Sequence, residues 1–157
     1  MLQPLEKYFP RTFALLSLQE KTRIDVEFFQ SYSLPQDLRY FPMMMKQSGL
    51  REEIVQTADY EYLAHMVKNS EETLMKKQGR FRLNSTIQWI VLESGAANLG
   101  KEPGLYGLWK FQGKTFERKL AQDEAQLISE IREHPELVAN SVEDPVIVRL
   151  QLDGILL

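Results

Sequence analysis

The chain has 157 residues, of which 43% are hydrophobic and 26% charged, with a net charge of −3 and no cysteine. This length and composition predict one soluble globular domain over residues 1–157, with a core that needs no metal or disulfide. The absence of cysteine excludes thiol catalysis, disulfides and cysteine-based zinc sites. No apolar run approaches the ~20 residues that span a bilayer, and the N-terminal region lacks a signal-peptide pattern. We therefore expect a cytoplasmic protein without a membrane partner, in which the glycosylation sequon Asn84-Ser85-Thr86 stays unused.

Helical patterns dominate residues 1–78. Ser17-Leu18-Gln19-Glu20 has the form of a capping box, in which a serine and a glutamate satisfy the free amides of a helix start. Apolar residues then recur at four-residue spacing on one side of the expected helix: Ile24, Phe28 and Tyr32.

Prolines interrupt the pattern after this helix. Pro35 and Pro42 bracket a short, broken segment, because proline is tolerated at a helix start but not inside a helix. Two helical turns are expected over residues 50–57. A longer amphipathic helix is expected to begin at Asp59 and to end near Gly79.

The second half favours extended structure. Strands are expected over residues 80–92, 105–111 and 114–120, and Gln112-Gly113 has the form of a two-residue hairpin turn. A helix follows from Gln122 to about Arg132, with a possible renewal after Pro135. The alternation of Val146, Val148, Leu150 and Leu152 predicts a last strand over residues 145–152.

This order of elements predicts an α+β fold. A helical N-terminal half, residues 1–78, should pack on a small, mostly antiparallel sheet of about four strands. The sheet and one further helix would occupy residues 79–157.

A glycine-rich segment resembles a phosphate-binding loop only in part. Gly95 and Gly100-Lys101 have the spacing of G-x-x-x-x-G-K-[ST], but Glu102 replaces the hydroxyl residue. Pro103-Gly104 follows where a helix would have to begin. We therefore expect a connection between two strands and no nucleotide cofactor.

Neither histidine belongs to a catalytic or metal-binding motif. His65 shares a predicted helix face with charged residues, which indicates a solvated surface, and His134 lies at a predicted helix end. Adjacent acids on a helix point ~100° apart and do not converge on one ion. The sequence therefore predicts no catalytic residue, metal or cofactor, although a Ser-His-Asp site that assembles in three dimensions stays open.

A methionine and aromatic cluster, residues 38–47, is the first candidate site. Methionine is flexible and recurs on surfaces that adapt to partners, and three consecutive methionines cannot all face one core. The alternative is that these methionines fill an irregular gap in the core. The first reading predicts a non-catalytic adaptor that binds another protein, and a Met44→Asp variant that loses binding but stays folded. Its contact residues would be Arg39, Tyr40, Phe41, Met43, Met44 and Met45.

A basic, aromatic-rich stretch, residues 76–119, is the second candidate. It has nine basic and three acidic residues, whereas residues 120–157 have two basic and eight acidic ones. Cations among exposed aromatic rings bind single-stranded nucleic acid or another polyanion, but the pI of 5.5 is low for such a binder, and the two segments could instead pair with each other. The residues of this alternative site are Arg80, Arg82, Trp109, Lys110, Lys114 and Arg118.

Overall fold

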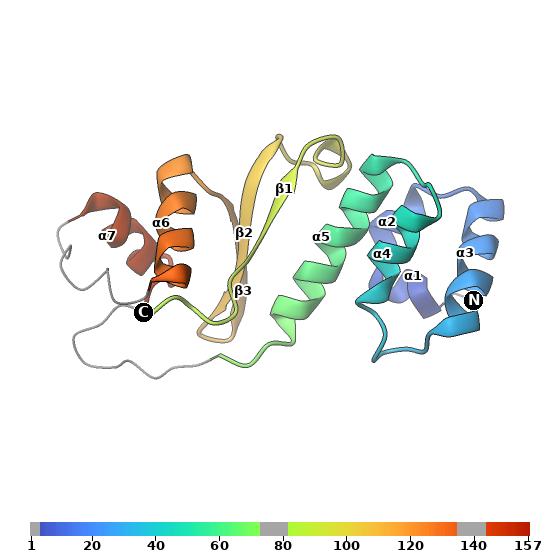
Figure 1. Cartoon of the computed structure of the whole chain (residues 1–157), viewed down its shortest axis with the longest axis horizontal. Helices are drawn as coiled ribbons and strands as arrows, with labels where there is room; N and C mark the ends of the chain where they lie inside the picture. The colour runs from blue at the N-terminus through green and yellow to red at the C-terminus, as the bar shows by residue number, and fades with distance from the viewer. Residues whose placement is uncertain (1–3, 73–81, 135–143) are drawn as a thin grey trace. The chain divides into compact units, whose positions relative to one another are not determined.

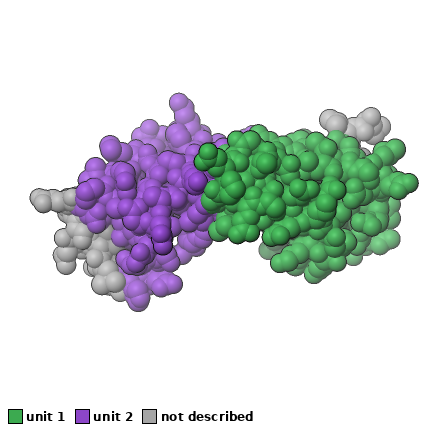
Figure 2. All heavy atoms as spheres, turned by 90° about the horizontal axis from the view of Figure 1, so that it is seen from above, with its two compact units in different colours: residues 1–66, 91–104 green, residues 67–90, 105–157 purple. Residues whose placement is uncertain are grey.

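The computed structural model describes residues 4–72, 82–134 and 144–157. The chain divides into two compact units, residues 1–66 with 91–104 and residues 67–90 with 105–157 (Figure 2). The described residues form seven α-helices, a short 3-10 helix and three strands (Figure 1). The α+β class and the helical N-terminal half are thus confirmed. The expectation of about four strands is wrong, because the sheet contains three.

Unit 1 is mainly helical. Its elements are α1 (Pro4–Tyr8), α2 (Pro10–Ala14), α3 (Leu18–Ser31), α4 (Tyr40–Gln47), α5 (Glu52–Lys68) and the 3-10 helix η1 (Ala97–Leu99). α3 begins at the predicted capping box: the Glu20 amide donates to the Ser17 hydroxyl at 3.2 Å, and the Ser17 amide donates to the Glu20 carboxylate at 3.0 Å. Pro42 lies in the first turn of α4, where a missing amide breaks no helical bond.

α5 corrects the predicted boundaries of the central helices. The two turns at 50–57 and the helix from Asp59 are one continuous helix, so Asp59 lies in its interior rather than at its cap. Glu52 and Glu53 occupy the first turn instead, where carboxylates interact favourably with the helix dipole. α5 ends at Lys68, and Gly79 lies outside the described residues.

Aromatic rings form the centre of the unit 1 core. The Phe41 ring lies 4.3 Å from that of Phe9, 6.0 Å from that of Phe13 and 6.1 Å from that of Phe28, measured between ring centroids. All four side chains are fully buried. Phe13, Phe28 and Phe41 come from α2, α3 and α4, and Phe9 lies between α1 and α2. This cluster therefore holds these helices together through contacts that add to the gain from apolar burial.

A buried glutamate completes the start of α2. Phe9 precedes this helix and offers no side-chain cap. The Glu61 carboxylate, from α5, accepts hydrogen bonds from the Arg11 amide at 3.1 Å, the Thr12 amide at 2.6 Å and the Thr12 hydroxyl at 2.7 Å. Burial raises the pKa of Glu61, although the hydrogen bonds from Thr12 act in the opposite direction.

The segment that resembles a phosphate loop is a connection between two strands, as predicted. The Gln56 side-chain oxygen accepts from the amides of Glu93 and Gly95, each at 2.9 Å. A Cβ atom on Gly95 would lie 2.7 Å from the Gln56 Cβ, so only glycine fits there. No helix opens after Lys101, because β2 begins at Gly104.

Unit 2 holds most of the sheet. β1 (Gln88–Leu92), β2 (Gly104–Phe111) and β3 (Lys114–Lys119) lie in the order β1-β2-β3. β2 and β3 are antiparallel, with Phe111 opposite Lys114. Gln112 and Gly113 have φ angles of 52° and 77°, the positive values that a type I′ turn requires at both positions. The predicted hairpin is confirmed.

Two predicted strands need correction. Of the strand expected over residues 80–92, residues 80 and 81 lie outside the described residues, Leu83 forms a single antiparallel bridge with Leu156, and β1 is the regular part. Between them the Asn84 side chain folds the chain into a turn, where its oxygen accepts from the Thr86 amide and hydroxyl at 2.9 and 2.7 Å. The Asn84 amide group donates to the carbonyls of Lys110 at 2.8 Å and Gly154 at 2.9 Å. This buried side chain therefore joins three segments of unit 2.

The strand predicted at 145–152 is a helix. α6 (Gln122–Glu133) is confirmed, and α7 (Pro145–Leu152) lies beside it (Figure 1). The Asp144 carboxylate accepts from the Val146 amide at 2.9 Å, and Pro145 occupies the first turn, so cap chemistry outweighs the apparent alternation. α7 buries Ile147 and Leu150, three residues apart, as a helix does. The C-terminal half, predicted to hold one helix, thus holds two in the described residues.

Candidate functional site

The predicted contact segment, residues 39–45, is divided between core and surface. Phe41, Met44 and Met45 are 0%, 6% and 0% exposed, respectively, and pack in the unit 1 core. Met43 is 44% exposed, Arg39 is exposed and Tyr40 is half-buried. The helical period of α4 explains this division, since it places Met44 and Met45 with Phe41 on one side and Met43 on the other.

Tyr40 is fixed by its neighbours. Its ring stacks on that of Tyr32, the residue that ends α3, with a centroid distance of 4.9 Å and an interplanar angle of 16°. The Arg39 guanidinium lies 4.7 Å from the Tyr40 ring centroid and donates to the Tyr40 hydroxyl at 2.7 Å. A cation–π contact and a stacked ring together restrict the rotamers of both side chains.

A second set of apolar side chains faces solvent from α3. Leu18, Val26 and Phe29 are 78%, 56% and 42% exposed. With Thr22 they fall within a sector of about 80° on the helix, about 140° from the buried Ile24 and Phe28. The Thr22 hydroxyl donates to the Leu18 carbonyl at 3.0 Å, so its hydrogen is already engaged within the helix. α3 therefore has an apolar face toward the core and a second one toward solvent.

An acidic residue borders this second face. Asp25 carries a buried carboxylate oxygen that has no hydrogen-bond partner in the part of the chain the structure describes. Burial raises the pKa of Asp25, and the nearby carboxylate of Glu6 raises it further. The sequence pattern missed this exposed face, because it followed only the side of the helix that holds Ile24, Phe28 and Tyr32. A helical wheel drawn from Leu18 separates the two sides.

The alternative basic site is not assembled as one exposed surface. Trp109 is 3% exposed, and its indole N–H donates to the Asp153 carbonyl at 2.8 Å. The Lys110 ammonium donates to the carbonyls of Lys68 and Ser70, each at 3.2 Å. Lys114 is exposed on the hairpin. The backbone of Arg82 exchanges hydrogen bonds with that of Leu157, and Arg80 lies outside the described residues.

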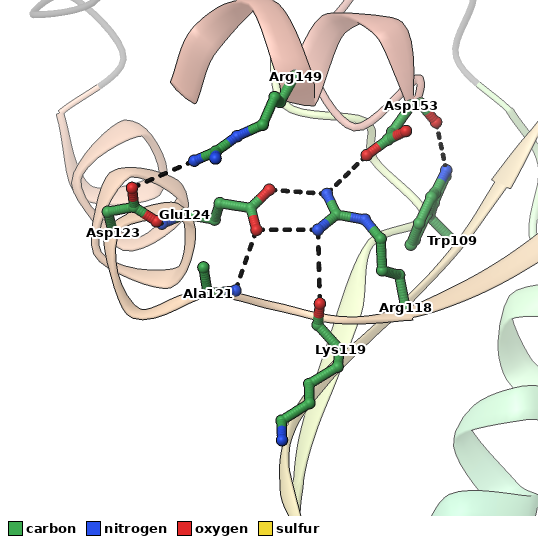
Figure 3. A network of polar contacts seen from close by, with 8 residues as sticks. All are labelled: Trp109, Arg118, Lys119, Ala121, Asp123, Glu124, Arg149 and Asp153. Atoms are coloured by element: carbon green, nitrogen blue, oxygen red, sulfur yellow. Dashed lines mark hydrogen bonds and ion pairs between the residues drawn. The ribbon is translucent and has the colours of Figure 1, made fainter. Parts of the chain in front are cut away.

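Arg118 is neutralised by two carboxylates (Figure 3). Its guanidinium donates two hydrogen bonds to Glu124, at 2.8 and 2.7 Å, and one to Asp153 at 2.6 Å. The hydrogen bonds from Arg118 lower the pKa of Glu124, which is 2% exposed and also accepts from the Ala121 amide. The carboxylates come from the start of α6 and the end of α7, so the network joins these helices to β3.

The two histidines belong to different helices, His65 to α5 and His134 to the end of α6. The His65 ring makes an edge-to-face contact with Tyr8, at a centroid distance of 5.3 Å and an interplanar angle of 88°. His134 ends α6, and its amide donates to the Glu130 carbonyl at 2.8 Å. Within residues 4–72, 82–134 and 144–157, no group of three or more His, Asp or Glu side chains could hold a metal ion. No helix in these ranges is long and apolar enough to cross a membrane.

Comparison with known proteins adds no assignment to this geometry. No protein-family model matches the chain, and no curated protein matches it. The exposed residues of α3 and α4 are therefore interpreted from their own chemistry.

Proposed function

We propose that this protein is a non-catalytic adaptor that binds another protein through α3 and α4. The binding residues, here called the α3–α4 surface, are Leu18, Val26, Phe29, Arg39, Tyr40 and Met43. The single observation that supports the proposal is the exposure of apolar side chains on these two helices, whose other faces fill the unit 1 core. Scattered exposed apolar residues are common, but three of these lie in one row on α3.

The chemistry of this surface suits a protein partner. Tyrosine and arginine are enriched among the residues that dominate interface energies. Ordering a side chain costs about 0.5–1.5 kcal/mol on binding, and Tyr40 is already held by Tyr32 and Arg39. Met43 is flexible enough to adapt to the shape of a partner. The α3–α4 surface thus combines a fixed aromatic group with adaptable apolar contacts.

Affinity purification of the tagged full chain from its own cells tests the proposal. A stoichiometric protein companion should be retained by the native chain and lost with Phe29→Asp and Met43→Asp. Leu152→Asp is the matched control, because Leu152 is a 79% exposed apolar residue on α7. Thermal unfolding of each variant checks that the fold persists. A companion that binds all three variants equally would reject the α3–α4 surface, and the absence of any companion would reject the adaptor function.

The nucleic-acid alternative receives less support from the structure. Of its described residues, Trp109 is buried and Arg118 is already paired with carboxylates. The same purification distinguishes the two functions, since a nucleic-acid complex would be sensitive to nuclease and would dissociate as the salt concentration rises.

A further inference from the structure

A small apolar pocket lies between α6 and the sheet of unit 2. It has a volume of about 90 Å³, close to the share of liquid volume of about three water molecules. Three of its lining residues come from strands or their ends, and three come from α6. They are Trp89, Leu105, Leu120, Ala125, Ile128 and Ser129.

Regular structure fixes the walls of this pocket. Ala125, Ile128 and Ser129 share one face of α6, because residues three and four apart lie above one another on a helix. The Leu120 amide donates to the Leu105 carbonyl at 2.8 Å. Gly107 leaves room for Leu120, whose side-chain carbons would lie 3.2–3.4 Å from a Cβ atom there. The cavity is therefore bounded by packed elements.

Ser129 lines the pocket on its α6 side, and Arg132 lies near it on the exposed surface of the same helix. Arg132 is three residues after Ser129, which places both on one side of α6. The Arg132 guanidinium lies 4.4 Å from the centroid of the Trp89 ring, and no carboxylate among the described residues forms an ion pair with it. The Ser129 hydroxyl has no hydrogen-bond partner within these residues either. By contrast, Arg118 and Arg149 in the same unit are both paired with acids.

We infer that this pocket binds a small hydrophobic carboxylic acid. The outer three carbons or so of an alkyl tail fill the volume, with the Trp89 ring and the aliphatic side chains around them, while the carbons next to the carboxylate lie at the mouth of the pocket. The carboxylate would meet Arg132, whose planar guanidinium matches the geometry of a carboxylate, and would accept a hydrogen bond from Ser129. An unpaired cation beside an apolar cavity favours an acid over a neutral ligand of the same shape. This site is separate from the α3–α4 surface and does not depend on the proposed adaptor function.

Hexanoate is a suitable probe for the full chain, and hexanamide is its neutral counterpart. The chain has two tryptophans, so its ¹H–¹⁵N NMR spectrum contains two indole signals, which a Trp89→Phe variant assigns. Hexanoate should shift the Trp89 signal saturably, with a Kd on the order of 1 mM for so small a ligand. The Trp109 signal should move little, because Trp109 does not line the pocket and its indole N–H donates a hydrogen bond to the Asp153 carbonyl.

Variants on α6 test the two parts of the site separately. Arg132→Gln should weaken hexanoate binding about tenfold and affect hexanamide binding much less, because only the acid uses the charge of Arg132; the loss of the contact with Trp89 is common to both ligands. Ala125→Leu should abolish the binding of both by filling the cavity. Gln126→Leu is the matched control, since Gln126 is exposed and lies outside the pocket; it should bind as the native chain does.

Three outcomes would overturn the inference. The first is a Trp89 shift that stays linear with hexanoate concentration, which indicates no specific site. The second is equal affinity for hexanoate and hexanamide. The third is unchanged hexanoate binding by Arg132→Gln or Ala125→Leu variants whose thermal unfolding matches that of the native chain.

Discussion

The guanidinium of Arg118 and the carboxylate of Glu124 form two parallel hydrogen bonds, at 2.8 and 2.7 Å, although only six residues separate them in the chain. This is the bidentate geometry that makes arginine–carboxylate pairs strong. Glu124 is buried while about a third of the Arg118 side chain is exposed. The pair therefore neutralises a carboxylate that water cannot solvate, and a change to either partner should affect folding more than surface charge.

Removal of the cation should destabilise unit 2. We expect Arg118→Met to lower the free energy of unfolding by about 2–3 kcal/mol, because the buried Glu124 loses its cation and keeps only the hydrogen bond from the Ala121 amide. The partial exposure of Arg118 keeps the effect below the largest known values. Arg149→Met is the matched control, since the Arg149–Asp123 pair is exposed and should contribute less than about 1 kcal/mol. Urea denaturation measures both. Equal losses would show that the burial of Glu124 is unimportant.

Two buried glutamates should respond to pH in opposite directions. The pKa of Glu124 is lowered from its usual 4.5 by the hydrogen bonds from Arg118, so its stabilising contribution is present above about 4.5 and is lost as the pH falls through the folded-state pKa. The pKa of Glu61 is raised from 4.5 by burial. Its contribution is therefore fully present below that value and is lost as the pH rises through the folded-state pKa.

Glutamine variants separate these two effects. The difference in unfolding free energy between the native chain and Glu61→Gln should be larger at about pH 4 than at pH 7, whereas the difference for Glu124→Gln should be larger at pH 7 than at about pH 3. Urea denaturation at each pH provides the values. A difference for Glu61→Gln that shows no pH dependence would contradict the raised pKa.

Adjacent methionines on α4 should differ in their tolerance of charge. Met44 is 6% exposed and Met43 is 44% exposed. Met44→Asp should destabilise the chain by about 3 kcal/mol or more, because a carboxylate would enter an apolar core. This replaces the expectation from the sequence that Met44→Asp would leave the fold intact. Met43→Asp should change stability by less than about 1 kcal/mol. Thermal unfolding compares the two, and similar melting temperatures would contradict the division of α4 into core and surface faces.

The stability of the chain can be raised by a residue better suited to the hairpin turn between β2 and β3. Gln112 has a φ of 52°, a left-handed conformation that asparagine adopts more readily than glutamine. We expect Gln112→Asn to stabilise the chain by about 0.5 kcal/mol and Gly113→Ala to destabilise it by about 1 kcal/mol, because Gly113 also has a positive φ. Chemical denaturation checks both signs. If Gly113→Ala stabilised the chain instead, the positive φ at this position would not determine the stability of the hairpin.

Features set by local chemistry were predicted well. The capping box at Ser17 and the turn at Gln112-Gly113 depend on residues within four positions of each other, so the sequence contains the whole interaction. The strand predicted at 145–152 failed for a related reason. Asp144 and Pro145 are a strong local start signal for a helix, and the alternation of apolar residues concealed it.

Contacts between distant segments were beyond the sequence pattern. Asp153 reaches Arg118 from 35 positions along the chain, and Glu61 caps α2 from 49 positions beyond Thr12. Arg118 was therefore predicted to belong to the nucleic-acid or polyanion site, whereas in the fold it pairs with Glu124 and Asp153. Half of the predicted contact segment was likewise found in the core, because only tertiary packing decides which side of α4 is covered.

The buried position of Asn84 has a practical consequence for producing the protein. A glycan on the sequon Asn84-Ser85-Thr86 would be attached to the side-chain nitrogen, which in the folded chain donates hydrogen bonds to the carbonyls of Lys110 and Gly154. Asn84 is 3% exposed, so an oligosaccharide cannot be accommodated there. In a secretory eukaryotic host, a transferase that modified the nascent chain would compete with closure of unit 2, and the modified molecules would be unable to reach the native state. A bacterial host, or an Asn84→Asp chain in a secretory one, avoids this competition, the latter at the cost of the two donated hydrogen bonds.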